Sequence, residues 1–535
     1  MPIAIPTAPI GSPAGTSSQT PSPLPFWLPA VLAAVAALAL YAVTLNGSYF
    51  YDDTILKEDT RFTHRHRWSQ FWTQDYMPNA VDRLYRPLTC MTFAVEFSLH
   101  GDRPWIYHLV NVLLHAGAAA AVAELARRLI SLRVACAAGV LFAIHPIHVE
   151  AVAGLVGRAE LLCTLATVIG LILYLKPMTS LRAMAIAACA IVALLSKEQG
   201  ILFPAMLLAM TPYRRQILNI HSTSDNVNAE RGAMGILIAS ISSITAAYLI
   251  LREQLLGFGW DRRFLDWAVN PLVRSEGADK ILMPLTLLGR YVALLVAPTK
   301  LSLDYGARVI GWTVNWRQPY VFIGAGALVV WIFAAIWSVR GRRWAALFCI
   351  LALAISYGIV SNAFVLIGTI FGERLMYMPS VFFLILVAAL LDHLLRPRFF
   401  AATIMVLASL GAVRAFTYAR LCNDPPALYL ANLRDQPNSM SLHGLVVNQY
   451  MSVGNYREAR VVGQDCLERL PDCWQSYQMC LEPDLKLHDF ADAERVLSHV
   501  DRRCPPVMIA PLWARLKFER DKFESQSPPR NDGRS

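Results

Sequence analysis

Two adjacent carboxylates, Asp52 and Asp53, are the first charged residues of this chain. They follow shortly after the apolar run 26–45, which has the ~20 residues needed to cross a bilayer. Charge beside a membrane is costly and usually marks a functional site. A carboxylate there could act as a general base towards a hydroxyl group. The simpler alternative is a solvated pair of side chains in a loop.

Several other polar sets follow at the ends of apolar segments. Four of the cations in these sets suit an anionic phosphate, because guanidinium and ammonium groups form charge-assisted hydrogen bonds with it. These cations are Arg86, Arg158, Lys197 and Arg374. The sets lie at 85–88, 108–115, 145–150, 157–160, 196–198, 303–305 and 372–377. We expect most of them to converge on one cavity at one face of a membrane.

Each set also has a structural interpretation. Lys197 with Glu198, and Glu373 with Arg374, could be ordinary ion pairs at the ends of spans. The types of His145, His148 and Glu150 would suit a divalent metal. Their spacing is not that of a zinc peptidase, so we predict no metal site there.

The elements that position these residues are membrane spans. The chain has 535 residues, of which 56% are hydrophobic and only 16% charged, whereas about a quarter would be charged in a soluble protein. The net charge of +10 could suggest nucleic acid as a partner. Lys and Arg instead form short clusters between apolar segments, which is the pattern of cytoplasmic loops. We therefore predict an integral membrane protein without a nucleic-acid partner.

The apolar segments and basic clusters predict about 11 spans. The basic clusters place Asp52, the loop 46–104 and the C-terminal region on the non-cytoplasmic side. A single crossing by the segment 281–298 would break this rule, so we expect it to be re-entrant or to lie on the outer side of the bundle. The alternative is a full crossing with a second, hidden crossing nearby. The expected spans are about 26–45, 105–125, 134–150, 155–175, 182–196, 199–211, 234–251, 320–339, 344–361, 377–393 and 399–415.

The C-terminal region is polar and repeats with a period of 34 residues, which is the length of a tetratricopeptide unit. The repeated positions are Tyr456, Glu458, Ala459 and Pro471, followed by Phe490, Asp492, Ala493 and Pro505. Asp484 departs from the pattern where the first unit has Tyr450.

Four regions follow from these patterns. We predict a disordered tail at 1–24, a membrane domain at 25–418, a tetratricopeptide-repeat domain at 419–524 and a second disordered tail at 525–535.

Together the motifs resemble those of the transmembrane and tetratricopeptide-repeat (TMTC-type) O-mannosyltransferases and their bacterial relatives. The resemblance covers essentially the whole chain after residue 40. Animal members carry many more repeats, which affects the expected acceptor more than the expected chemistry. The motifs lie at 46–53, 85–88, 108–115, 145–160, 196–198, 301–305 and 373–380.

The resemblance implies an all-α, polytopic glycosyltransferase of the GT-C class. Such enzymes transfer a sugar, usually mannose, from a polyprenyl phosphate to Ser or Thr hydroxyls of proteins on the non-cytosolic side, with inversion. The partners would be this donor, an acceptor protein held by the repeats, and the bilayer. The leaving group is a phosphate that cationic side chains can stabilise. No cofactor is then required, although a divalent cation is possible.

The resemblance also implies roles for individual residues. Asp52 or Asp53 would be the general base, and which of them acts stays open at this point. Arg86, Arg158, Lys197 and Arg374 would bind the donor phosphate. The residues expected to position substrate are His145, His148, Glu150, Glu160, Glu198, Asp304, Tyr305 and Glu373.

Two other functions fit the same sequence. A related enzyme could transfer the sugar to a lipid or glycan, or a non-catalytic scaffold could recruit partners through its repeats. The Ala-rich spans and short loops favour a bacterial inner membrane with a periplasmic site. The alternative location is the endoplasmic reticulum membrane with a lumenal site.

Overall fold

The computed structural model describes residues 25–76, 83–218, 224–257, 270–273, 275–311 and 313–526. All regular secondary structure in these ranges is helical, which confirms the predicted all-α fold class. Helices fill the chain because long apolar segments can satisfy their backbone groups in a bilayer only internally. The predicted tails 1–24 and 525–535 lie outside the described residues, except for the last turn of α23 (Pro506–Gln526).

Seven segments of the described chain are long and apolar enough to cross a membrane. They are Leu28–Asn46, Pro104–Leu129, Leu155–Tyr174, Ala229–Leu256, Pro319–Arg340, Glu373–Leu394 and Pro397–Leu421. A bent pair, Leu132–Ile144 with Pro146–Ala153, makes an eighth if it is counted as one broken span with a bend of 49°. These spans identify an integral membrane protein.

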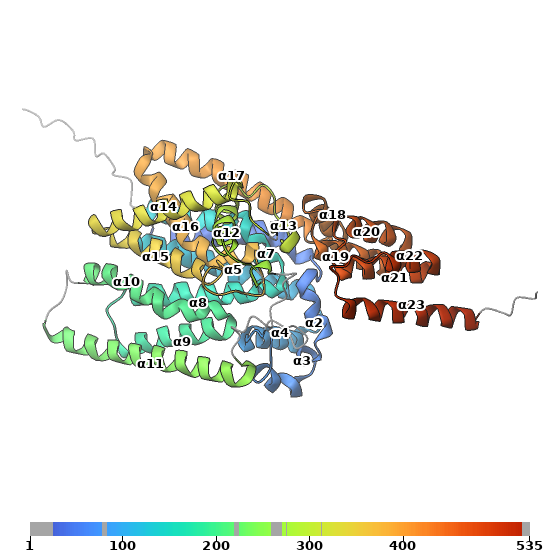
Figure 1. Cartoon of the computed structure of the whole chain (residues 1–535). Helices are drawn as coiled ribbons and strands as arrows, with labels where there is room; N and C mark the ends of the chain where they lie inside the picture. The colour runs from blue at the N-terminus through green and yellow to red at the C-terminus, as the bar shows by residue number, and fades with distance from the viewer. Residues whose placement is uncertain are drawn as a thin grey trace, which may run out of the picture.

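The helices that make up these segments are labelled in Figure 1. They are α1 (Leu28–Tyr41), α5 (Pro104–Leu129), α6 (Leu132–Ile144), α7 (Val149–Ala153), α8 (Arg158–Tyr174), α11 (Ser224–Leu256), α14 (Pro319–Arg340), α16 (Tyr377–Leu394) and α17 (Pro397–Leu421). Short helices occupy the polar connections, namely α2 (Ile55–Glu58), α3 (Thr60–Thr63), α4 (Pro87–His100) and α13 (Ala307–Ile310).

The three remaining predicted spans correspond to α9 (Ser180–Ser196), α10 (Phe203–Leu218) and α15 (Trp344–Gly358). The segment 281–298, which we expected to be re-entrant or on the outer side of the bundle, corresponds to α12 (Asp279–Val296). The 15 to 17 residues of α15 and α9 rise only ~25 Å at 1.5 Å per residue, short of the ~30 Å hydrocarbon core. The figure of about 11 spans therefore stays a prediction.

Small residues allow α1, α5 and α6 to pack closely. A Cβ atom on Gly139 of α6 would lie 2.6 Å from the Cβ of Ala123 on α5 and 3.0 Å from that of Ala33 on α1. Such small-residue contacts are typical of helices that associate inside a membrane. They fix the direction in which α1 delivers the chain to Asp52.

Helices α12 and α14 cross even more closely. A Cβ on Gly289 would lie 2.0 Å from the carbonyl oxygen of Tyr320, and one on Gly324 would lie 1.9 Å from that of Leu285. The two backbones thus touch at this crossing. Because α12 also contains Asp279, Lys280 and Arg290, it is not among the seven apolar spans, and its path relative to a membrane stays a prediction.

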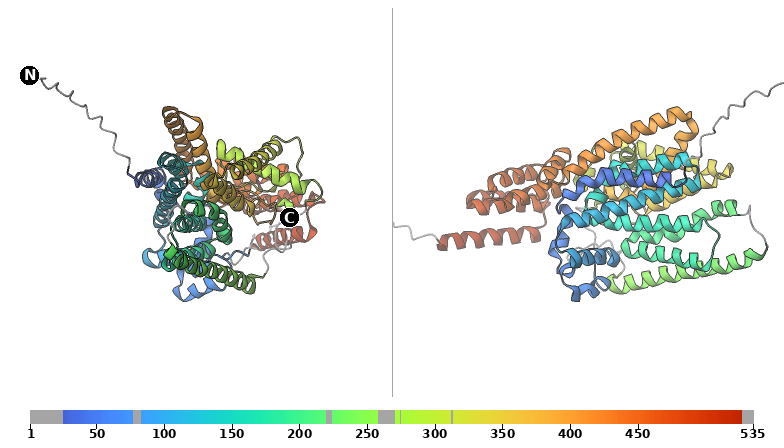
Figure 2. Two further views of the ribbon diagram at one scale, coloured as in Figure 1. Left: turned by 90° about the vertical axis from the view of Figure 1, so that its left-hand side faces the viewer. Right: turned by 180° about the vertical axis from the view of Figure 1, so that it is seen from behind.

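The two ends of the bundle differ in what they carry. Figure 1 and the rear view in Figure 2 show the helices α2–α4 at the same end as the C-terminal helices. The turns from α14 to α15 and from α16 to α17 lie at the opposite end. Those turns contain Arg342 and Arg396. The fold thus separates basic turns from the polar loop that contains Asp52.

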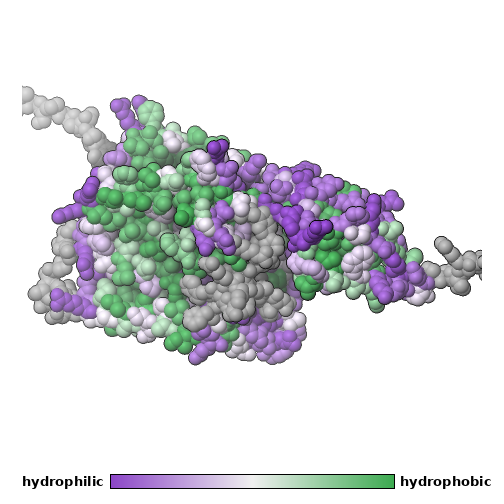
Figure 3. Space-filling model, in the orientation of Figure 1, coloured by the Kyte–Doolittle hydropathy of each residue, from purple (hydrophilic) through white to green (hydrophobic). Residues whose placement is uncertain are grey.

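The outer surface of the bundle is apolar. Figure 3 shows a broad hydrophobic area over the bundle and a mostly hydrophilic surface over the C-terminal helices. Exposed side chains such as Phe322 and Phe333 on α14, and Leu410 and Val413 on α17, contribute to it. In a bilayer these side chains would contact lipid.

The C-terminal region contains six helices. They are α18 (Pro425–Asp435), α19 (Met440–Ser452), α20 (Tyr456–Arg469), α21 (Trp474–Leu487), α22 (Phe490–Ser498) and α23. Helices α20 and α22 begin at Tyr456 and Phe490, 34 residues apart, and each buries an equivalent alanine, Ala459 and Ala493. Two helical hairpins therefore match the predicted period, whereas the assignment to a tetratricopeptide domain stays a prediction.

Candidate functional site

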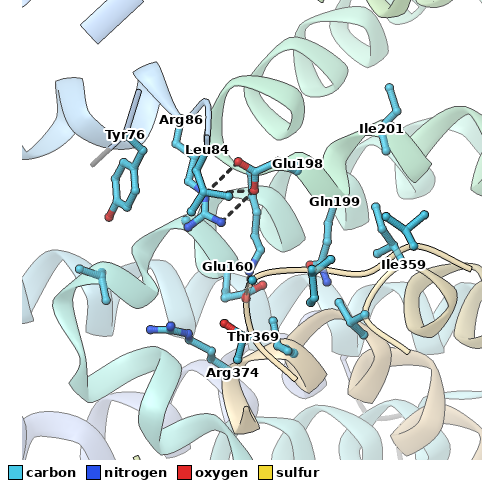
Figure 4. A pocket seen from close by; sticks show the side chains of 18 of the residues that line it. Tyr76, Leu84, Arg86, Glu160, Glu198, Gln199, Ile201, Ile359, Thr369 and Arg374 are labelled. Carbon is cyan, nitrogen blue, oxygen red and sulfur yellow. Dashed lines mark hydrogen bonds and ion pairs between the residues drawn. The ribbon is translucent and has the colours of Figure 1, made fainter. Parts of the chain in front are cut away.

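A cavity of about 450 Å³ lies among the polar connections of the bundle. Its size is in the range of ~300–1,000 Å³ that is usual for small-molecule sites. Five parts of the chain contribute to its wall, namely 51–52, Tyr76 with Leu84 and Arg86, 156–160, 197–201 and 248–252. A sixth, at 359–375, closes it on another side (Figure 4).

Seven charged side chains line this cavity. Four are cations and three are anions, which leaves an excess of one cation. The charged residues are Arg86, Lys197, Arg252 and Arg374 together with Asp52, Glu160 and Glu198. The three carboxylates pair with Arg86, Lys197 and Arg374, whereas Arg252 donates to the backbone carbonyl of Arg83. One positive charge is therefore not balanced by a carboxylate of the cavity wall, which favours a ligand with a negative charge.

Arg374 connects Asp52 to a second carboxylate. Its Nη1 donates to Oδ2 of Asp52 at 2.8 Å, and its Nε lies 3.4 Å from Oε1 of Glu150. The Arg374 backbone N–H also donates to Oε2 of Glu150 at 2.8 Å. Asp52 and Arg374 line the cavity, whereas Glu150 lies behind them. Glu150 thus positions Arg374, and Arg374 orients Asp52.

Asp53 lies in a different environment from its neighbour. It is 1% exposed and does not line the cavity. Its Oδ1 accepts a hydrogen bond from the backbone N–H of Val156 at 3.0 Å, and its Oδ2 has no partner. Burial raises the pKa of Asp53 to about 7. Of the two carboxylates, only Asp52 reaches the cavity.

The backbone immediately before Asp52 is strained. Tyr51 has a φ of +51°, which costs energy for a residue other than glycine. Its N–H donates to the hydroxyl of Tyr429 on α18 at 2.9 Å. A residue of the C-terminal region therefore holds the turn that presents Asp52.

Arg86 and Glu198 form a two-pronged ion pair at the cavity wall. Nε and Nη2 of Arg86 donate to the Glu198 carboxylate at 2.8 to 3.2 Å, as drawn in Figure 4. The backbone N–H of Tyr85 also donates to this carboxylate. Burial would raise the pKa of Glu198, but Arg86 outweighs this and holds that pKa below its ordinary value.

Lys197 pairs with Glu160 in the same wall. Nζ of Lys197 contacts Oε1 of Glu160, and Oε2 of Glu160 is buried without a partner. Burial lowers the pKa of Lys197 well below its ordinary value, and Arg86 acts in the same direction. Lys197 is only 6% exposed, so its contact with Glu160 lies where little water competes.

Arg158 does not line this cavity, contrary to the expected contact with the donor phosphate. It is fully buried, and its guanidinium donates to Glu96, Thr92, Asn111 and the carbonyl of Tyr107. These five hydrogen bonds use all five N–H groups of an arginine side chain. Arg158 therefore positions α4 and α5 and has no donor left for a phosphate.

His145 and His148 also lie outside the cavity lining. His148 contacts the carbonyl of Phe142 through Nδ1 and the hydroxyl of Ser380 through Nε2, both at 2.8 Å. His145 Nε2 donates to the carbonyl of Leu295, and its Nδ1 accepts from the N–H of Ile147. Both rings thus stabilise helix packing. Among the residues that the structure describes, no group of three His, Cys, Asp or Glu side chains is arranged to hold a metal.

Asp304, Tyr305 and Glu373 form a separate cluster beside the cavity. Glu373 accepts hydrogen bonds from the hydroxyl of Tyr305 at 2.6 Å and from the N–H of Ser302 at 2.7 Å. Asp304 accepts one from the Ser439 hydroxyl at 2.6 Å. This cluster fastens the loop 301–306 to the C-terminal helices and does not face the cavity.

Several residues that line the cavity were not predicted from the sequence. The structure adds Tyr51, Gln199, Arg252 and Thr369 to the lining. Gln199 directly follows the predicted set 196–198, so a polar residue within an otherwise apolar stretch was an available signal. Nothing in the sequence pointed to Thr369, because it lies in an ordinary-looking loop.

No protein-family model matches the chain. The chain is similar over most of its length to protein O-mannosyl-transferases of the TMTC type, and this confirms the resemblance seen in its motifs.

The human protein O-mannosyl-transferase TMTC4 is 25% identical over 79% of this chain and 64% of its own length. The mouse TMTC2 is 29% identical over 52% of this chain and 36% of its own length, and the human TMTC2 is 37% identical over 26% and 18%. The chain thus spans less than two thirds of these relatives.

Among solved structures, the chain is similar to the apo oligosaccharyltransferase of Archaeoglobus fulgidus. The TM-score is 0.35 and the identity 14%, over 77% of this chain and 56% of the other.

Proposed function

We propose that the protein is a GT-C-class membrane glycosyltransferase. It transfers a sugar, most often mannose, from a polyprenyl phosphate to Ser or Thr hydroxyls of proteins. The observation that carries the proposal is the position of Asp52 in a cavity with four cations, in a chain whose curated relatives are protein O-mannosyl-transferases.

Asp52 is the general base of this proposal. Its carboxylate accepts the proton of the acceptor hydroxyl while the hydroxyl oxygen attacks the anomeric carbon of the sugar. Arg374 supports this role because its 2.8 Å contact orients the Asp52 carboxylate. Asp53 is a positioning residue, since its Oδ1 holds the backbone at Val156.

The phosphate of the lipid donor is the leaving group. The bond from the anomeric carbon to the phosphate oxygen breaks, its electron pair stays with the phosphate, and attack from the opposite side inverts the anomeric centre. Arg86, Lys197 and Arg374 stabilise the negative charge on the phosphate, with Arg252 as a further cation of the same wall. Preformed charges of this kind supply transition-state stabilisation without a metal.

The two ends of the bundle support a proposal for the acceptor and the compartment. The C-terminal helices α18–α23 lie at the Asp52 end (Figure 1), where stacked helical hairpins would hold an acceptor protein. With the basic turns in the cytoplasm, the cavity opens on the non-cytosolic side. A bacterial inner membrane is the favoured location, and the endoplasmic reticulum membrane is the alternative.

The test uses the purified full-length protein with polyprenyl-phosphate mannose and Ser- or Thr-containing peptides. We expect labelled peptide from the wild type and none above background from Asp52→Asn. Asp392→Asn is the matched control, because Asp392 pairs with Arg133 away from the cavity. No transfer from any polyprenyl-linked sugar would refute the enzyme, and transfer to lipid or glycan alone would identify the related class with another acceptor.

A further inference from the structure

Two side chains of the cavity wall have polar atoms without partners. Both amide atoms of Gln199, Nε2 and Oε1, are buried and unpaired, and so is Oε2 of Glu160. Gln199 is 3% exposed and Glu160 is 1% exposed. No group of the described chain uses these three atoms, whereas the other oxygen of Glu160 contacts Lys197.

The backbone holds Gln199 firmly in this position. It belongs to the turn Glu198–Leu202, which follows α9 directly. A Cβ on the next residue, Gly200, would lie 2.4 to 2.6 Å from backbone atoms of Ala193 and Leu194. The turn is therefore packed tightly against the end of α9, with no room for a side chain at residue 200. Figure 4 shows the Gln199 side chain extending from this turn towards the segment that carries Thr369.

Unpaired buried polar groups are unfavourable, and three of them in the wall of one cavity call for a partner such as a ligand or an ordered water. Their chemistry indicates the kind of ligand. A carboxylate oxygen accepts from a hydroxyl and repels an anion, whereas an amide both donates and accepts. Neighbouring hydroxyl groups of a sugar offer this combination. Lys197, which contacts the other oxygen of Glu160, lines the same cavity and is one of the proposed phosphate-binding cations.

We propose that Gln199 and the free oxygen of Glu160 bind hydroxyl groups of the transferred sugar, so that Gln199 determines which sugar is accepted. This inference rests on the proposed function. The donor then lies with its phosphate at Arg86, Lys197 and Arg374 and its sugar ring against Gln199. A sugar that lacks the recognised hydroxyl leaves the amide unpaired and is rejected.

The experiment compares Gln199→Met with the wild type on polyprenyl-phosphate mannose and its monodeoxy analogues. We expect the wild type to lose about 10-fold or more in kcat/KM on the analogue that lacks the recognised hydroxyl. Gln199→Met should lose a similar factor on mannose itself and little more on that analogue. Gln216→Leu, an exposed residue near the end of α10, is the matched control and should behave as wild type.

Thermal unfolding separates recognition from a structural role. The Tm of ligand-free Gln199→Met should be unchanged or higher, because the substitution removes two unpaired buried atoms. Gln199→Leu is the second variant, should the first fail to fold. If the wild type transfers mannose but both variants keep its kcat/KM on every donor, the inference is refuted. If the wild type transfers no sugar, the proposed function fails, and the inference fails with it.

Discussion

Asp52 and Asp53 are neighbours in sequence, but their side chains face opposite environments. Asp52 is at the cavity and Asp53 is enclosed by protein. We expect Asp52→Asn to lower kcat by about 100-fold or more, because general-base catalysis contributes ~10²–10⁴, with little effect on Tm. A rate of product formation close to that of wild type would refute the assignment of the base.

Asp53 should make stability depend on pH. Its pKa of about 7 is raised above the ordinary ~3.9, so the folded state holds a proton that the unfolded state releases. The stability is therefore fully present below about pH 4 and is lost as the pH rises through about 7. Over that window the free energy of unfolding should fall by up to about 4 kcal/mol, at ~1.4 kcal/mol for each pKa unit.

Asp53→Asn should remove this contribution, since its side-chain oxygen can still accept from Val156. Thermal unfolding of both proteins in detergent between pH 5 and pH 8 measures the difference. Parallel pH profiles for the two proteins would show that Asp53 does not titrate in this range.

The residue types in the sequence predicted most of the charged side chains that line the cavity, but they did not predict the contacts that each one makes. Asp52, Arg86, Glu160, Lys197, Glu198 and Arg374 were all expected at one site, and all line one cavity. Arg158 was expected with them, but Glu96, 62 residues earlier in the chain, takes its charge. A sequence shows that a charge is present and not which distant residue neutralises it.

At the scale of elements, α18 holds the turn that presents Asp52. We expect Tyr429→Phe to lower kcat with little change in KM, because the N–H of Tyr51 loses its acceptor and the turn loses its alignment. An unpaired backbone donor costs about 1–3 kcal/mol, equivalent to about 5- to 150-fold. Tyr450→Phe on α19 is the control, and equal kcat for the two variants would contradict the role of Tyr429.

The crossing of α12 and α14 should tolerate no side chain. Gly324→Ala would force a Cβ to within 1.9 Å of the Leu285 carbonyl oxygen, and we expect a clear loss of thermal stability. Gly326→Ala on the same helix meets nothing within 4 Å and should be tolerated. Unfolding in detergent, followed by circular dichroism, compares the two variants, and equal Tm values would mean that the crossing is not rigid.

At the scale of the whole molecule, the two ends of the bundle should lie on opposite sides of the membrane. His393→Cys, in the last turn of α16, and Ser525→Cys, in the last turn of α23, are exposed positions at these ends. A maleimide that cannot cross membranes should label only Ser525→Cys in intact cells and both after lysis. Labelling of both variants in intact cells would overturn the predicted orientation.

The positions of the apolar segments in the sequence predicted where the helices lie, but not how many of them cross the membrane. Every expected span corresponds to a helix or a broken helix, because a run of apolar residues must bury its backbone in one of these forms. Whether α9, α10, α12 and α15 reach both faces depends on their tilt and on their neighbours, and the pattern of residue types contains no information about these.

The hydrogen bond between Tyr51 and Tyr429 has a consequence for biosynthesis. Every residue that lines the cavity lies between 51 and 375, so the ribosome has made the whole cavity wall before α18 emerges. The turn at Asp52 is nevertheless held in place only after Tyr429 has been synthesised, because the hydroxyl of Tyr429 accepts the hydrogen bond from Tyr51. A nascent chain, or one cut after α17, would thus have all the helices of the membrane bundle but an unaligned Asp52, and the proposed activity would arise only late in synthesis.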